Sequence, residues 1–145
     1  MKSYYIDSCI WLNLFQKEGD SRKGKPYWLI AEDFIKSVIV SENSQIACSS
    51  AILREIQSKL DSKSYACQRK WMNSDAKIML LKINSSDVEF AHKLESELNY
   101  DISYYDCLHI AICMRLGLVL ITRDKKLLKI ASKYVPALKP EELIN

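Results

Sequence analysis

Four acidic residues stand where their carboxylates can act together. Asp7 directly follows an apolar stretch, and Asp124 lies three residues past another. Glu55 and Asp106 lie in stretches of helical spacing that flank the apolar stretches. Each acid also has a purely structural interpretation. Asp7, Asp106 and Asp124 can cap helices, and Glu55 can pair with Lys59 on a solvated helix face.

Carboxylates that converge need charge compensation. Two of them about 4 Å apart repel by roughly 4 kcal/mol at an effective dielectric constant of 20, so one takes up a proton unless a cation is present. An all-oxygen site favours Mg²⁺ or Mn²⁺ over zinc, and Mg²⁺ readily shares a phosphate ligand. Such ions activate a water for phosphodiester hydrolysis. The acids therefore indicate metal-dependent chemistry on phosphodiesters, provided that they meet.

Alternating strands and helices must position these acids. The expected strands are Lys2–Ile6, Gln45–Cys48, Ile78–Ile83, Leu118–Ile121 and Ala137–Leu138. The expected helices are Ser8–Gln16, Pro26–Ser41, Ser49–Leu60, Ser64–Asn73, Ser86–Leu98, Ser103–Leu116 and Lys125–Lys133. This alternation predicts an α/β three-layer sandwich, with a short parallel sheet of about four to five strands between helices. Ligands bind such sheets at the carboxyl ends of the strands, where the acids lie.

Length and composition narrow the class of protein. The chain has 145 residues, which favours a single domain over residues 1–145, and 48% of them are hydrophobic. The net charge is 21 − 18 = +3, which permits a polyanionic partner without demanding one. The longest uncharged stretch, Asn43–Leu53, is too short to span a membrane. Asp7 interrupts any signal peptide, so we expect a cytoplasmic protein.

The cysteines and histidines give little support to a zinc site. There are five cysteines and no Cys-x-x-Cys pair, so a disulfide framework is not expected. His109 and Cys113 can share one helix face, but two ligands do not make a site. We therefore interpret both as buried side chains.

Four segments together resemble the four motifs of the PIN-domain family, which includes the VapC-like toxin ribonucleases of toxin–antitoxin pairs. They are Tyr5-Ile6-Asp7-Ser8, Ser50-Ala51-Ile52-Leu53-Arg54-Glu55-Ile56, Ser103-Tyr104-Tyr105-Asp106-Cys107-Leu108-His109-Ile110-Ala111 and Leu120-Ile121-Thr122-Arg123-Asp124-Lys125-Lys126-Leu127. The resemblance covers nearly the whole chain. It implies an endoribonuclease that hydrolyses RNA by a metal-activated water, and it implies that this ribonuclease is the toxin of such a pair.

The resemblance also implies roles for individual residues. The acidic quartet would be the catalytic residues and the ligands of Mg²⁺ or Mn²⁺: Asp7, Glu55, Asp106 and Asp124. Ser8 and Thr122 would orient carboxylates or waters. His109 lies one turn after Asp106, and we favour a core or supporting role for it over that of a catalytic base.

An RNA substrate needs positive charge beside the acids. The candidates are Arg22, Lys23 and Lys25 in a basic loop, and Arg123 and Lys125 beside Asp124. The alternative for each of them is a solvated charge. Trp11, Trp28 and Trp71 can stack on bases, but their place on apolar helix stripes favours packing.

Two other functions stay open. The chain can be a catalytically inactive PIN-like module that binds RNA or serves assembly, although the intact quartet argues against this. A signalling receiver would want paired acids at the end of the first strand, where Asp7 stands alone. The apolar stripes of the first three helices suit a core, a homodimer or an antitoxin helix. The expected partners are therefore RNA, an antitoxin and a second copy of the chain.

Overall fold

The computed structural model describes residues 1–144 and contains one parallel sheet of five strands. Along the sheet the strands follow the order β3-β2-β1-β4-β5, so β1 lies at the centre. Every neighbouring pair is parallel, as the sequence pattern predicts. The strands are β1 (Lys2–Ile6), β2 (Ser44–Ser49), β3 (Ile78–Leu81), β4 (Val119–Ile121) and β5 (Ala137–Leu138).

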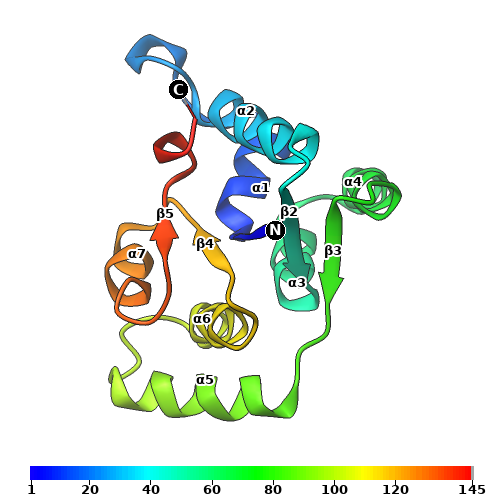
Figure 1. Cartoon of the computed structure of the whole chain (residues 1–145). Helices are drawn as coiled ribbons and strands as arrows, with labels where there is room; N and C mark the ends of the chain where they lie inside the picture. The colour runs from blue at the N-terminus through cyan, green and yellow to red at the C-terminus, as the bar shows by residue number, and fades with distance from the viewer. Residues whose placement is uncertain (145) are drawn as a thin grey trace.

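Residues 1–144 also form seven α-helices and two short 3-10 helices, of which the last follows β5 (Figure 1). They are α1 (Ser8–Phe15), η1 (Ser21–Lys23), α2 (Tyr27–Val40), α3 (Ser50–Lys59), α4 (Ser62–Ser74), α5 (Ser85–Glu97), α6 (Tyr104–Leu116), α7 (Lys125–Ala131) and η2 (Pro140–Glu142). No helix in residues 1–144 combines the length and apolar character needed to cross a membrane.

Side chains alternate across the central strand and reveal the layers. The ring of Tyr4 meets Phe34 of α2 edge-on, with ring centroids 5.5 Å apart. The next side chain, Tyr5, contacts His109 of α6. Successive side chains of a strand point to opposite faces, so α2 and α6 cover opposite faces of the sheet. In Figure 1, α5 runs beneath α6, on the side away from α2. The molecule is therefore a three-layer α/β sandwich, as predicted.

Two element boundaries correct the sequence analysis. Strand β3 ends at Leu81 rather than Ile83, because its partner β2 ends at Ser49 and Ser49 pairs with Leu81. Helix α5 starts from Asn84, whose N–H donates to the carboxylate of Asp87 at 2.9 Å. Helix α5 therefore begins at Ser85 and not at the expected Ser86. Asn84 and Asp87 stand three residues apart, which is the spacing of a capping box.

Local side chains and backbone conformation also set the ends of α6 and α4. Ser103 caps α6 by accepting the N–H of Asp106 at 3.1 Å. Gly117 ends that helix in the left-handed conformation, with φ of 64°, which glycine adopts without steric cost. Asp61 caps α4 through the N–H of Ser64, so that helix starts two residues before the predicted Ser64. Trp11 is fully buried, in agreement with a packing role.

A partly buried ion pair joins α6 to the start of α5. The guanidinium of Arg115 donates to both carboxylate oxygens of Asp87, at 2.8 and 2.9 Å, and Asp87 is 2% exposed. Burial alone would raise the pKa of Asp87, but the hydrogen bonds from Arg115 and from the Asn84 N–H outweigh it. They hold the pKa of Asp87 below its ordinary value.

We expect Asp87→Asn to lower the free energy of unfolding at neutral pH by about 2 kcal/mol, because it removes charge-assisted hydrogen bonds. The contribution of Asp87 is complete above the unfolded-state pKa of about 3.9 and disappears as the pH falls through the lower folded-state pKa. Urea unfolding of both proteins between pH 7 and pH 2.5 measures the difference. An equal difference across that range would contradict the prediction.

Candidate active site

Asp7 is fixed at the carboxyl end of the central strand. Ile6 pairs with Ile121 across β1 and β4, and the N–H of Asp7 donates to the carbonyl of Ile121 at 2.8 Å. The carboxylate of Asp7 accepts the N–H of Ser8 at 2.8 Å and caps α1. Asp7 is 5% exposed, so its charge lies in a largely desolvated position.

Thr122 links Asp7 to Asp124. Its hydroxyl donates to Oδ2 of Asp7 at 2.7 Å and accepts the N–H of Asp124 at 3.1 Å. Asp124 itself caps α7 through the N–H groups of Lys126 and Leu127. The structure therefore places Thr122 where the sequence analysis expects a carboxylate-orienting residue. Ser8 reaches Asp7 through its backbone N–H rather than through its hydroxyl.

The other two acids, Glu55 and Asp106, lie on helices α3 and α6. Asp106 lies in the first turn of α6, and one oxygen each of Asp7 and Asp106 and one ring nitrogen of His109 lie within 4.8 Å of one another. Glu55 of α3 joins this group through its Oε1, which lies 2.7 Å from Nε2 of His109. Residues from three separate stretches of the chain thus meet in one place.

The pKa of Asp106 reports how the four acids act on one another. Burial raises the pKa of Asp106 to about 6, and the negative charge of Asp7 adds to this effect. Asp124 and Glu55 raise the pKa further, whereas His109 opposes the shift. The structure thus brings Asp7 and Asp106 together and joins Glu55 to them through His109, whereas Asp124 is exposed and is linked to Asp7 through Thr122.

The negative charge of Asp7 also shifts the pKa values of His109 and Cys9. Burial works to lower the pKa of His109, but its hydrogen bond to Glu55 and the charge of Asp7 raise that pKa above its ordinary value. Cys9 donates its S–H to Oδ2 of Asp7 at 3.4 Å. Burial and the charge of Asp7 raise the pKa of Cys9 to about 12, so Cys9 is a thiol at neutral pH and not a nucleophile.

The donor set fits a hard divalent cation. Carboxylate oxygens are the ligands that Mg²⁺ and Mn²⁺ prefer, and a divalent cation would compensate the repulsion that raises the pKa of Asp106. His109 and Cys113 are both fully buried, as expected, and the group of side chains able to hold a metal in residues 1–144 does not include Cys113.

The predicted RNA-binding residues differ in their surroundings. The guanidinium of Arg123 lies 4.0 Å from the ring centroid of Tyr27 and 2.8 Å from Glu141, and its side chain is only 14% exposed. Its role in RNA binding stays a prediction, as does that of the other four. Arg22 pairs with Asp20 and Lys25 with Asp33, whereas Lys23 and Lys125 are exposed.

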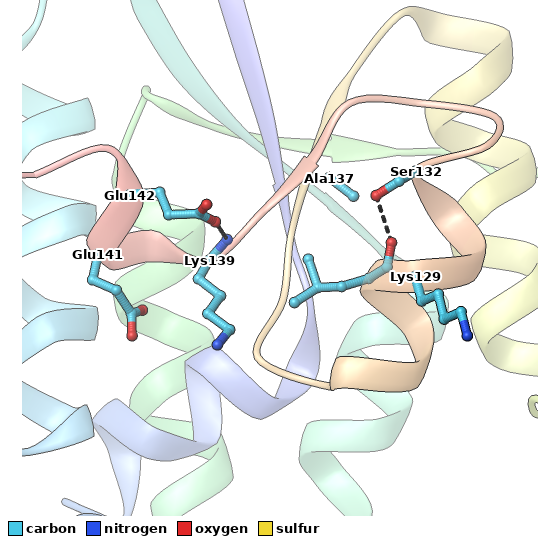
Figure 2. A pocket seen from close by; sticks show the side chains of 7 residues that line it. Lys129, Ser132, Ala137, Lys139, Glu141 and Glu142 are labelled. Carbon is cyan, nitrogen blue, oxygen red and sulfur yellow. Dashed lines mark hydrogen bonds between the residues drawn. The ribbon is translucent and has the colours of Figure 1, made fainter.

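A separate open hollow of about 510 Å³ lies between α7, β5 and η2 (Figure 2). Figure 2 shows Lys139 between Ala137 of β5 and Glu142 of η2, with its backbone N–H bonded to the Glu142 carboxylate. Lys129 and Glu141 also line the hollow, and none of the acidic quartet does. This hollow is therefore distinct from the acidic cluster.

The sequence analysis did not single out two residues that support the cluster. Tyr5 lies between Ser49 and His109, with its hydroxyl 2.7 Å from each. The available signal was the alternation along β1, which places Tyr5 and Asp7 on the same face. Ser49 enters the sequence analysis only as the start of the helix Ser49–Leu60, and in the structure it caps α3.

Comparison with known proteins identifies a family by sequence. The PIN domain family matches residues 4–133 of the chain. No curated protein matches the sequence as a relative.

Several solved structures share the fold at low sequence identity. VapBC2 from Rickettsia felis, solved with a fragment of promoter DNA, has a TM-score of 0.63 and 22% identity over 94% of this chain and 98% of that one. VapBC-1 from nontypeable Haemophilus influenzae has a TM-score of 0.65 and 16% identity over 96% and 98%. The sarcin-ricin loop cleaving toxin VapC20 from Mycobacterium tuberculosis has a TM-score of 0.62 and 18% identity over 91% and 96%. At these identities the likeness establishes the architecture.

Proposed function

Since the chain belongs to the PIN domain family, we propose that it is a metal-dependent endoribonuclease that hydrolyses RNA phosphodiester bonds. The observation that carries the proposal is the meeting of Asp7 and Asp106 within 4.8 Å, with Glu55 and Asp124 close enough to raise the pKa of Asp106. Such a cluster is costly to the fold unless a cation binds there.

In this proposal the acidic quartet binds Mg²⁺ or Mn²⁺. The ion supplies Lewis acidity toward the phosphate and lowers the pKa of a water ligand. The residues of the chain hold the geometry. Asp7 is held by the Thr122 hydroxyl and the Ser8 N–H, and Asp124 is held by the first turn of α7. These contacts leave the carboxylates little freedom, which lowers the entropic cost of binding an ion.

We further propose that the ribonuclease is the toxin of a toxin–antitoxin pair. The support is the PIN family and a fold shared with the VapBC proteins of R. felis and H. influenzae. A hollow of about 320 Å³ lies between α1 and α4 and is lined in part by Leu14, Phe15 and Trp71. Its apolar lining is suited to bind apolar side chains of a partner protein. A homodimer stays a prediction, and a monomeric mass in light scattering would contradict it.

Removal of metal tests the enzyme assignment directly. We expect the purified protein to cleave single-stranded RNA in Mg²⁺ or Mn²⁺, to stop in EDTA, and to recover when excess Mg²⁺ is returned, because the carboxylates repel the phosphate unless a cation lies between them. Cleavage is followed on a labelled RNA by gel electrophoresis. Cleavage that continues in EDTA would contradict a metal-dependent enzyme.

Binding of Mn²⁺ separates this proposal from an inactive RNA-binding module. We expect Thr122→Val to weaken Mn²⁺ binding about 10- to 100-fold, because it removes the hydrogen bond that orients Asp7. Thr122→Ser keeps the hydroxyl and is the matched control. Titration calorimetry measures both. Equal Mn²⁺ affinities of the two variants would contradict a role of the Thr122 hydroxyl in metal binding. Absence of Mn²⁺ binding by the original protein would favour the inactive module.

A further inference from the structure

A chain of hydrogen bonds runs from the first turn of α3 to the acidic cluster. The N–H of Ile52 donates to the hydroxyl of Ser49 at 3.4 Å, and that hydroxyl lies 2.7 Å from the hydroxyl of Tyr5. The Tyr5 hydroxyl lies 2.7 Å from Nδ1 of His109, whose Nε2 lies 2.7 Å from Oε1 of Glu55. Ser49, Tyr5 and His109 are all fully buried.

For a neutral imidazole, the donors and acceptors fix the direction of this chain of hydrogen bonds. A backbone N–H can only donate, so Ser49 accepts from Ile52 and its own proton is free for Tyr5. A phenol is protonated at neutral pH, so the buried Tyr5 hydroxyl donates its proton to Nδ1 of His109, which lies 2.7 Å away. A carboxylate can only accept, so Nε2 of His109 carries the proton that it donates to Glu55. Every donor in the chain then has an acceptor.

The charge of the imidazole does not alter its contact with Glu55. In the neutral ring Nδ1 accepts from Tyr5. In the cationic ring Nδ1 donates to Tyr5, which then donates to Ser49. Nε2 carries a proton in both cases. The assignment thus rests on the geometry of the four side chains and not on the titration of His109.

We propose that His109 is a positioning residue that holds the Glu55 carboxylate by a hydrogen bond from Nε2, and that its ring does not ligate the metal ion. The proposal rests on the proposed function, since it concerns the same site. Asp7, Asp106 and His109 lie close enough to resemble a mixed nitrogen–oxygen metal site. A protonated Nε2 has no lone pair to offer, so the chain from Ser49 keeps the ligand set all-oxygen and favours Mg²⁺ or Mn²⁺ over zinc.

Helix α3 is therefore held at two points by one chain of hydrogen bonds. Ser49 caps its first turn, and His109 holds Glu55 in its second turn. Tyr5 connects the two points through the central strand. A shift of α3 would break both contacts, so the chain fixes how far Glu55 lies from Asp7.

Nitrogen-15 NMR of the imidazole tests the direction of the chain. The sequence contains two histidines, and His92, whose side chain is 63% exposed, is removed by His92→Gln to leave one imidazole signal. We expect a protonated Nε2 in the metal-free protein that stays protonated when Mg²⁺ or Mn²⁺ is added. An unprotonated Nε2 before addition, or loss of its proton when the ion binds, would overturn the proposal.

Two substitutions of His109 separate positioning from packing. His109→Gln keeps an amide N–H near the position of Nε2, whereas His109→Leu keeps bulk and removes the donor. We expect His109→Leu to weaken Mn²⁺ binding about 10- to 100-fold and His109→Gln to restore most of the loss, as measured by titration calorimetry. Equal losses in both folded variants would reduce His109 to a packing role and overturn the proposal.

Failure of this inference is distinguishable from failure of the proposed function. If the original protein binds no Mn²⁺, the metal-dependent function fails, and the NMR of the metal-free protein still decides the direction of the chain. If the original protein binds Mn²⁺ while the ring nitrogen coordinates the ion, the function stands and the positioning role fails. If His109→Leu does not fold, His109→Gln and the NMR experiment decide.

Discussion

Replacement of Asp7 by Asn is expected to reduce Mg²⁺-dependent RNA cleavage at least ~1,000-fold, which corresponds to about 4 kcal/mol of lost transition-state stabilisation. The substitution is unusually selective. Asn caps a helix about as well as Asp does, and its amide oxygen can still accept from Thr122 or from the Ser8 N–H. The variant therefore loses the negative charge and keeps one of these two hydrogen bonds, because Ser8 and Thr122 donate to different oxygens of Asp7 and an amide has only one oxygen.

A matched control makes this result specific to the site. Asp61 caps α4 through the N–H of Ser64 at 2.8 Å, and it is not part of the acidic quartet. We expect Asp61→Asn to cleave RNA at the rate of the original protein. Rates are measured on purified proteins with circular dichroism as the check on folding. Unchanged cleavage by Asp7→Asn, or an equal loss in Asp61→Asn, would remove Asp7 from the proposed active site.

Asp106→Asn is expected to change stability and metal binding in opposite directions. Asp106 is a partly buried carboxyl whose charged form is disfavoured by burial and by the charge of Asp7. Removal of that charge should stabilise the metal-free protein at neutral pH by about 1 to 3 kcal/mol. The same change removes a ligand, so the stabilisation of the original protein by added Mn²⁺ should disappear in the variant.

Thermal unfolding with and without Mn²⁺ measures both effects in one experiment. The expected pattern is a higher Tm for Asp106→Asn in EDTA and a Tm that no longer rises with Mn²⁺. Expression in a bacterial host should give growth arrest with the original protein and none with the variant. A variant that is less stable in EDTA and still gains from Mn²⁺ would assign Asp106 to a structural role.

Asp7 and Asp124 were predictable because each follows a parallel strand, and the carboxyl ends of parallel strands share one edge. Thr122 was predictable only by resemblance, although its hydroxyl proves to contact Asp7 and the N–H of Asp124. The end of β3 was not predictable, because the length of its partner β2 sets it.

The sequence by itself determined the order of strands and helices and the start of a helix at Ser103, because hydrophobic periodicity and capping are local properties of neighbouring residues. Only the tertiary structure decided that His109 contacts Glu55, 54 positions away, and Tyr5, 104 positions away. It likewise decided that Arg123 lies against Tyr27. Such contacts depend on how close the sheet brings distant segments and on which way each side chain points, and no local pattern encodes either quantity.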